Sequence, residues 1–285
     1  MPQFPPFIDE RLNHHLRKSV GEPAVLARAV ADLEGYRHEP IQQIADRYWT
    51  SPMAPADQRP ESLLQFYQTS DRYLYESTMT EGYRDHQRMT RLVVAAARRW
   101  RLAPMLDFGG GGGGLTVALG ARGVPCDYAD VPGALTDFVR WRLAQRGVAA
   151  TIHDATKPLP PARYRAVLAV DVLEHVPDLV STVRQLKCAL QPGGWLIGTH
   201  SFTPDDPLHL ASSHQYGDLK KFDAFMQTER FRYRGRLKAC VVSEALYRHT
   251  GRSVIWTARL SRKLKGGGNL LVYAAPRNLD ELLAR

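Results

Sequence analysis

Six consecutive glycines at residues 109–114 constrain this chain more than any other feature. They follow a short apolar run, residues 105–108, of the kind that fills a strand buried on both sheet faces, and they precede a segment with helical spacing. Each glycine costs roughly 0.5 to 1 kcal/mol relative to alanine in an ordered element, so the run needs a structural or functional reason. The unit predicts a strand, a glycine turn that a ligand approaches closely, and a helix.

An acid near the glycines strengthens this interpretation. Asp130 ends the next apolar segment, where an acid closing the second strand of such a unit can accept two hydrogen bonds from a ribose diol. The glycines fit two spacings. Gly109, Gly111 and Gly114 match the GxGxxG pattern of dinucleotide sites. Gly109, Gly111 and Gly113 match a second pattern, LDxGxGxG. The choice between them depends on the rest of the chain.

From residue 104 onward the sequence alternates strand and helix patterns, which implies a parallel sheet with covering helices. In such sheets ligands bind at the carboxyl ends of the strands. The expected strands are 104–108, 124–129, 148–153, 164–171 and 194–200, and the expected helices are 113–121, 134–146 and 177–190.

Two further motifs lie at the ends of this pattern: DVLEHV at residues 171–176 and LQPGG at residues 190–194. With the LDxGxGxG pattern and the acids after the second and third strands, residues 104–200 resemble a class I S-adenosylmethionine methyltransferase. The resemblance implies an α/β, Rossmann-like, doubly wound, mostly parallel seven-stranded sheet. It also implies a terminal antiparallel hairpin, formed by VIWTARLSR (254–262) and NLLVYAAP (269–276).

The resemblance implies S-adenosyl-L-methionine as cofactor and a set of residues that bind it. The glycines would cradle the methionine moiety, the acid after the second strand the ribose, and the residues after the third strand the adenine. Poly-glycine departs from the family, which has larger residues between its glycines, and this leaves the pairing of each glycine with a contact open. The implied set is Asp107, Gly109, Gly111, Gly113, Asp130, Val131, Asp154, Ala155, Asp171 and Val172.

Residues 1–100 read as a helical cap or substrate lid, and residues 101–285 as the methyltransferase domain, with an insertion at about 202–217. The cap is rich in aromatic side chains that either pack or line a pocket. Tyr73 and Tyr75, together with His175 after the fourth strand, are the predicted substrate-binding residues.

The insertion concentrates histidines at the expected mouth of the pocket: His200, His209 and His214. A neutral imidazole within reach of an acceptor can take its proton, so these are the predicted catalytic residues. His209, between two leucines, is the first choice. The spacing matches no established ligand motif, and no metal site is predicted.

The composition and charge of the chain limit the classes of partner that it can bind. The 285 residues are 44% hydrophobic, with a net charge of +9. Fifteen basic and eight acidic side chains fall in residues 201–285, and residues 229–238 alternate basic with apolar groups. A solvated strand face explains this pattern better than a nucleic-acid platform. Three separated cysteines predict reduced thiols and a cytoplasmic protein, and no stretch is long and apolar enough for a signal peptide or membrane span.

The sequence therefore predicts a methyltransferase that acts on a small-molecule acceptor at nitrogen, oxygen or carbon, by direct displacement. By analogy the acceptor is an aromatic or amino-acid-derived secondary metabolite. A homodimer is compatible with the sequence. The alternatives are an RNA methyltransferase that uses the basic C-terminal third, a non-catalytic cofactor-binding scaffold and an NAD-dependent oxidoreductase.

Overall fold

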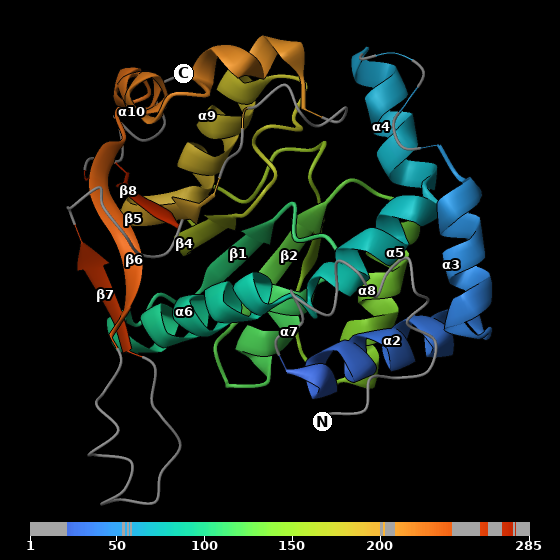
Figure 1. Cartoon of the computed structure of the whole chain (residues 1–285). Coiled ribbons are helices and arrows are strands. Elements are labelled where there is room, and N and C mark those ends of the chain that lie inside the picture. The colour runs from blue at the N-terminus through green and yellow to red at the C-terminus, as the bar shows by residue number, and fades with distance from the viewer. Residues whose placement is uncertain are drawn as a thin grey trace, which may run out of the picture.

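The computed structural model describes residues 22–52, 55, 57, 59–199, 202, 209–240, 257–261, 270–275 and 277. These residues form one twisted sheet with helices on both faces (Figure 1). The sheet order is β3-β2-β1-β4-β5-β8-β6-β7, and the first five of these strands are parallel. The strands are β1 (Met105–Phe108), β2 (Cys126–Asp130), β3 (Ile152–Asp154), β4 (Tyr164–Ala169), β5 (Leu190–Gly198), β6 (Arg232–Cys240), β7 (Thr257–Ser261) and β8 (Leu271–Ala274).

The fold class predicted from the sequence is confirmed, with a correction at the C-terminal end. The segments predicted to pair as a hairpin contribute β7 and β8, but both pair antiparallel with β6, which lies between them. In the described part of the chain the sheet thus has eight strands. β6 separates β7 from β8 because it pairs along its length with both strands, with β8 from Arg232 to Arg236 and with β7 from Arg236 to Cys240.

Helices α2 to α5 pack with one another and with α8 at one end of the molecule, whereas α6 lies against the sheet and runs toward β7 (Figure 1). Residues 22–100 are mostly helical, as predicted, and residues 1–21 lie outside the described residues. The predicted domain boundary at residue 100 stays a prediction. The helices are α2 (Pro23–Arg37), α3 (Ile41–Thr50), α4 (Pro60–Thr69), α5 (Asp71–Thr80), α6 (Arg84–Trp100), α7 (Gly114–Gly120), α8 (Ala134–Gln145), α9 (Leu179–Ala189) and α10 (Leu219–Thr228), with a 3-10 turn at η1 (Ala211–Tyr216).

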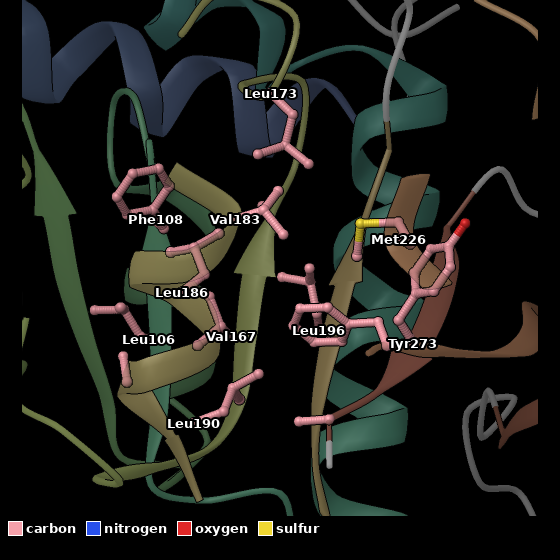
Figure 2. Packing of buried hydrophobic residues seen from close by; sticks show 14 of the residues in the cluster. Leu106, Phe108, Val167, Leu173, Val183, Leu186, Leu190, Leu196, Met226 and Tyr273 are labelled. Atoms are coloured by element: carbon pink, nitrogen blue, oxygen red, sulfur yellow. The ribbon is translucent and has the colours of Figure 1, made fainter. Parts of the chain in front are cut away.

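Strand alternation divides the core into two faces. Leu106 and Phe108 of β1 point to the face covered by α9 and α10, where they meet Val183 and Leu186 (Figure 2). Met105, one residue along, points to the face covered by α6 and α7. Because the central strands are buried on both faces, they are rigid, and the loops at their carboxyl ends are held in fixed positions.

The buried stripe of α6 lies where the helical spacing predicts it. Leu92, Val93 and Ala96 are all at most 2% exposed and pack on the sheet. The described helices include none that is both long and apolar enough to cross a bilayer. Cys126 is buried and carries a free thiol, as predicted for this cysteine.

Candidate functional site

The carboxyl ends of β1, β2 and β4 lie side by side. Phe108 pairs with Ala129 on one side and with Ala169 on the other, so the chain leaves all three strands at the same edge. The glycine loop, Asp130 and the segment that begins at Val170 therefore converge there. This is the position at which a parallel sheet binds its ligands.

The glycine loop uses the positive-φ spacing of the LDxGxGxG pattern. Gly109, Gly111 and Gly113 have φ values of +64°, +54° and +75°, whereas Gly114 is the first residue of α7. At Gly109 a Cβ atom would lie 2.2 Å from Cγ2 of Val172, so no other residue fits there. The backbone therefore follows the LDxGxGxG pattern, which includes Gly113. It does not follow the dinucleotide pattern, which includes Gly114.

Asp130 holds the loop from the neighbouring strand. Its Oδ2 accepts a hydrogen bond from the Gly111 N–H at 3.1 Å and one from the Tyr128 hydroxyl at 3.2 Å, and its Oδ1 accepts the Val131 N–H at 2.8 Å. Burial raises the pKa of this carboxyl to about 6, against the hydrogen bonds from the two backbone amides, which lower it. The Tyr128 hydroxyl can donate instead to the Gly111 carbonyl at 2.8 Å, which leaves two of the about four lone-pair sites of the carboxylate for a diol.

Asp107 lies beneath the loop and is 1% exposed. Its Oδ2 accepts a hydrogen bond from the Thr116 hydroxyl of α7 at 2.9 Å. Burial and the nearby Asp130 carboxylate raise the pKa of Asp107 to about 6, against the Thr116 hydrogen bond, which lowers it. Among the predicted cofactor residues, Asp107 thus ties the start of α7 to β1.

Two cavities meet at this edge, and Tyr73, Gly109 and His175 line both. The smaller has a volume of about 100 Å³ and mostly apolar walls. Its lining includes Leu63, Tyr67, Phe108, Asp130, Val131, Ala155 and Val172. The larger has a volume of about 230 Å³ and more polar walls. Its lining includes Glu76, Ser77, Glu81, His86, Asp107, the glycine loop and Asp171.

Most of the predicted cofactor residues therefore surround one connected site, but Gly113 and Asp154 are not in its described lining. The described lining of the two cavities contains Ala155 but not Asp154. Asp154 Oδ1 instead accepts the N–H and the hydroxyl of Thr156, at 2.8 and 2.6 Å. Asp154 thereby shapes the turn that presents Ala155 to the smaller cavity.

Asp171 follows β4 with a φ of +48°, an uncommon value for a residue with a side chain. Its N–H donates to Oγ1 of Thr199 at 2.9 Å, and the Thr199 hydroxyl donates back to Asp171 Oδ1. This reciprocal pair fixes the turn between β4 and the DVLEHV segment. The side chain remains exposed at the larger cavity.

Of the predicted substrate-binding residues, Tyr73 and His175 line both cavities, but Tyr75 does not. Tyr75 is 3% exposed, and its ring packs on that of Tyr48 with centroids 4.7 Å apart. The prediction for Tyr75 is wrong because its side chain belongs to the core between α3 and α5. Tyr67 of α4, which the sequence analysis did not single out, contacts the Tyr73 ring at 5.0 Å.

Of the predicted catalytic histidines, His209 is 7% exposed, and its ring packs on that of His175 with centroids 4.9 Å apart. It lies behind His175 rather than in the described cavity lining. His214 lies in η1 and is also outside that lining, whereas His200 lies outside the described residues. The predicted insertion at 202–217 is described only in part, and its residue Phe202 packs in the core.

Glu174 completes this cluster behind the cavity. Glu174, His175 and His209 each offer one atom of a kind that binds metals, and the three atoms lie within 4.8 Å of one another. Two imidazoles and one carboxylate suit a divalent cation, and they also suit a proton relay. The sequence prediction of no metal site stays a prediction.

A buried network of charged side chains, which the sequence did not indicate, supports the glycine loop. Arg142 of α8 is 3% exposed and donates to both carboxylate oxygens of Glu81 and, at 2.8 Å, to Oδ2 of Asp32. The two carboxylates raise the pKa of Arg142 against the opposing effect of burial. The three residues come from positions 32, 81 and 142, and no local pattern in a sequence reveals such a long-range group.

The residues of this site fit S-adenosylmethionine. An apolar cavity of base size adjoins Asp130, and the positive-φ loop lets a ligand approach the backbone. Comparison with family models agrees, because residues 80–237 match one described as "Methyltransferase domain". The family match supports S-adenosylmethionine as cofactor, and the NAD-dependent oxidoreductase interpretation is wrong.

Curated relatives are similar in sequence to part of the chain. A ubiquinone biosynthesis O-methyltransferase of Chromobacterium violaceum is 31% identical over 33% of this chain and 42% of its own length. One of Nitrosospira multiformis is 32% identical over 35% of this chain and 44% of its own length. The chain thus spans less than half the length of these relatives.

Solved structures also align with the chain, at low sequence identity. Magnesium protoporphyrin IX methyltransferase from Synechocystis PCC 6803, solved with bound SAM, is 15% identical and aligns with a TM-score of 0.45 over 71% of this chain and 84% of its own. The match to the family model extends over more than half of the present chain. The chain belongs to the methyltransferase domain family.

Proposed function

We propose that this protein transfers the methyl group of S-adenosylmethionine to a small-molecule acceptor, at nitrogen, oxygen or carbon. One observation carries the proposal. The carboxylate of Asp130 binds the Gly111 N–H at the point where an apolar cavity and a polar cavity meet. This arrangement supports a nucleoside in the first cavity and a reacting centre in the second.

Particular residues would hold the cofactor. Val131, Ala155 and Val172 would enclose the adenine, and Asp130 would accept the ribose hydroxyls. The glycine loop would lie against the methionine moiety. When bound, the cofactor supplies a methyl group on a sulfonium, which an acceptor attacks directly. The protein therefore has to align two molecules and exclude water, and no covalent enzyme intermediate is needed.

The described helices α4 and α5 provide the alignment. Leu63 and Tyr67 of α4 and Tyr73 of α5 wall the smaller cavity, while Glu76 and Ser77 wall the larger one. A built Cβ on Gly111 would lie 3.5 Å from Cβ of Ser77, so α5 sits directly over the glycine loop. This contact supports the predicted role of the N-terminal helices as a substrate lid.

His175 is the residue best placed to accept a proton from the acceptor. It lines both cavities, and His209 and Glu174 stand behind it. We assign the general-base role to His175 and a positioning role to His209. General-base catalysis contributes typically about a hundredfold to ten-thousandfold in rate.

The acceptor class rests on analogy and on the relatives. The curated relatives are named as O-methyltransferases of ubiquinone biosynthesis, which favours an aromatic acceptor in a small-molecule pathway. The position of the basic residues in the sheet disfavours an RNA acceptor. The basic strand β6 lies beyond β5 and β8 from the site at β1 and β2, at the opposite end of the sheet (Figure 1).

The test combines binding with turnover. Calorimetric titration with S-adenosylhomocysteine measures the cofactor site, and a cell extract incubated with enzyme and deuterated-methyl S-adenosylmethionine reveals the labelled product. We expect one-site binding and one labelled small molecule. Binding without any labelled product would favour a non-catalytic scaffold, and label in bulk RNA would favour the RNA methyltransferase.

A further inference from the structure

A third cavity adjoins the larger of the two cavities described above, because Glu81, His86 and Gly114 line both. Its lining comes from α2, α6, α7 and α8, whose positions Figure 1 shows. The volume is about 330 Å³, which is in the range of small-molecule sites. None of the residues assigned above to the adenine and the ribose lines this cavity. The third cavity is therefore a separate candidate site.

The described lining of the third cavity is basic. It contains five arginines and two glutamates, whereas the described lining of the two cofactor cavities contains no lysine or arginine. The arginines are Arg28, Arg91, Arg122, Arg142 and Arg146. His86 adds no charge at neutral pH, because burial lowers its pKa below the usual range. A cleft lined by an excess of one sign of charge concentrates ions of the other sign, so this cavity should attract anions.

Three of the arginines form ion pairs with acids. The pairs are Arg142 with Glu81 and Asp32, Arg146 with Asp32, and Arg91 with Glu22. The other two, Arg28 and Arg122, pair with no acid in the part of the chain that the structure describes. Both are exposed, and they lie on α2 and directly after α7. Two cationic side chains on separate elements therefore line one cavity that solutes can enter.

Small apolar side chains line the cavity between the arginines. They are Val25 of α2 and, on and just after α7, Val117, Ala118 and Ala121. Arg122 donates from Nη1 to the carbonyl oxygen of Ala118 at 3.0 Å, which holds its guanidinium beside this apolar surface. A guanidinium has five N–H donors, so Arg122 can still bind an anion. The cavity thus offers an apolar surface next to cationic donors.

We propose that the third cavity binds a small organic anion, namely a molecule with an apolar body and a phosphate or carboxylate group that Arg28 and Arg122 hold. The apolar body lies against Val117 and Ala118. This second ligand site goes beyond the proposed methyl transfer and does not depend on it.

The chemistry of the side chains selects this class of ligand. The planar guanidinium of arginine matches the geometry of phosphate and carboxylate oxygens, and hydrogen bonds between ionised groups are stronger than neutral ones. A cationic ligand would meet like charge in this cavity. The described lining of the cofactor cavities offers an anion no lysine or arginine, so an organic anion should prefer the third cavity.

The test uses matched probes on the wild-type protein saturated with S-adenosylhomocysteine, in about 0.15 M NaCl to screen the net charge of the chain. Phenyl phosphate, benzoate and the neutral benzamide are compared by ligand-observed NMR titration. At least one anion is expected to bind at least about tenfold more tightly than benzamide, a difference of about 1.4 kcal/mol. The tighter anion identifies phosphate or carboxylate as the preferred group. Equal affinity for the anions and benzamide, or binding of neither anion, would overturn the proposal.

Variants locate the bound anion. Arg28→Gln and Arg122→Gln are each expected to weaken binding of the preferred anion about three- to tenfold. The control, Arg98→Gln, replaces an exposed arginine in the last turn of α6 outside the cavity lining, and it should leave the affinity unchanged. An unchanged affinity in either of the first two variants, or an equal loss in the control, would overturn the proposal.

The same samples separate this inference from the proposed function. All three variants replace exposed side chains, so they should unfold at the same temperature as the wild type and bind S-adenosylhomocysteine equally well. Failure of the wild type to bind S-adenosylhomocysteine would refute the proposed function alone. The anion titrations, repeated on the protein without S-adenosylhomocysteine, would then still decide the present proposal.

Discussion

Arg142 donates a hydrogen bond from Nη1 to the carbonyl oxygen of Gly112 at 2.6 Å, so a side chain of α8 fixes the middle of the glycine loop. The same guanidinium binds Glu81, at the C-terminal end of α5, and Asp32 of α2. The Arg142 guanidinium thus links α2, the end of α5 and the glycine loop.

Replacing Arg142 by methionine should therefore affect folding and binding together. Glu81 would stay buried without its cation, and Asp32 would keep only its ion pair with Arg146, which together cost about 3 to 5 kcal/mol in the free energy of unfolding. The affinity for S-adenosylhomocysteine should fall as well, because the Gly112 carbonyl loses its donor. Urea unfolding and calorimetry measure the two effects.

Arg140→Met is the matched control on the same helix. Arg140 pairs with Asp137, and both side chains are about 60% exposed. This change should cost at most about 1 kcal/mol and leave the affinity unchanged. Equal effects of the two substitutions would mean that the buried network does not support the loop.

Asp130 should make cofactor affinity depend on pH. Burial raises the pKa of this carboxyl to about 6, and the ionised form is the better acceptor for a ribose diol. The affinity for S-adenosylhomocysteine should therefore rise as the pH rises from 5 to 7. Asp130→Ala should weaken binding by about 2 to 4 kcal/mol and remove most of this dependence. An Asp130→Ala variant with wild-type affinity would place the ribose contact elsewhere.

Asp107 should make stability depend on pH in the opposite sense to an ordinary paired acid. Its pKa is raised from 3.8 to about 6, so between these values the folded protein binds more protons than the unfolded chain. Its contribution to the free energy of unfolding therefore falls as the pH rises through this range, by about 1 to 3 kcal/mol. Relative to the wild type, Asp107→Asn should gain stability between pH 4 and about 6.5. A constant difference between the two unfolding curves would contradict the assignment.

Substitutions in the cluster of Glu174, His175 and His209, together with chelator treatment, distinguish a general base from a metal site. His175→Ala should lower kcat at least about a hundredfold. His209→Ala should have a smaller effect, since His209 lies behind His175. The activity of the wild type should survive a chelator. Loss of activity in chelator, with recovery on adding a divalent metal, would show that Glu174, His175 and His209 bind a metal.

The sequence predicts the sheet and the glycine loop well because both depend on local patterns. The apolar run before Gly109 and the later alternation of strands and helices determine the order of the parallel elements. The C-terminal pairing was wrong, because residues 254–262 and 269–276 can each pair with any neighbouring strand. Only the position of β6 in the folded sheet decides between these partners.

Side-chain direction limits the prediction of the site. Tyr73 and Tyr75 are two residues apart on α5, and a helix turns about 100° per residue, so they point to nearly opposite sides. Only one of them could line the cavity, and the sequence did not say which. The positions of Glu81 and Arg142 depend on packing between α5 and α8, which local patterns do not encode.

The most direct test of the central claim is calorimetric titration of the wild type and Gly109→Ala with S-adenosylhomocysteine and with NAD. A Cβ at residue 109 would overlap Val172 where the two cavities meet. We predict one-site binding of S-adenosylhomocysteine to the wild type, none to Gly109→Ala, and no binding of NAD to either. Binding of NAD, or of S-adenosylhomocysteine to both proteins with equal affinity, would contradict the account.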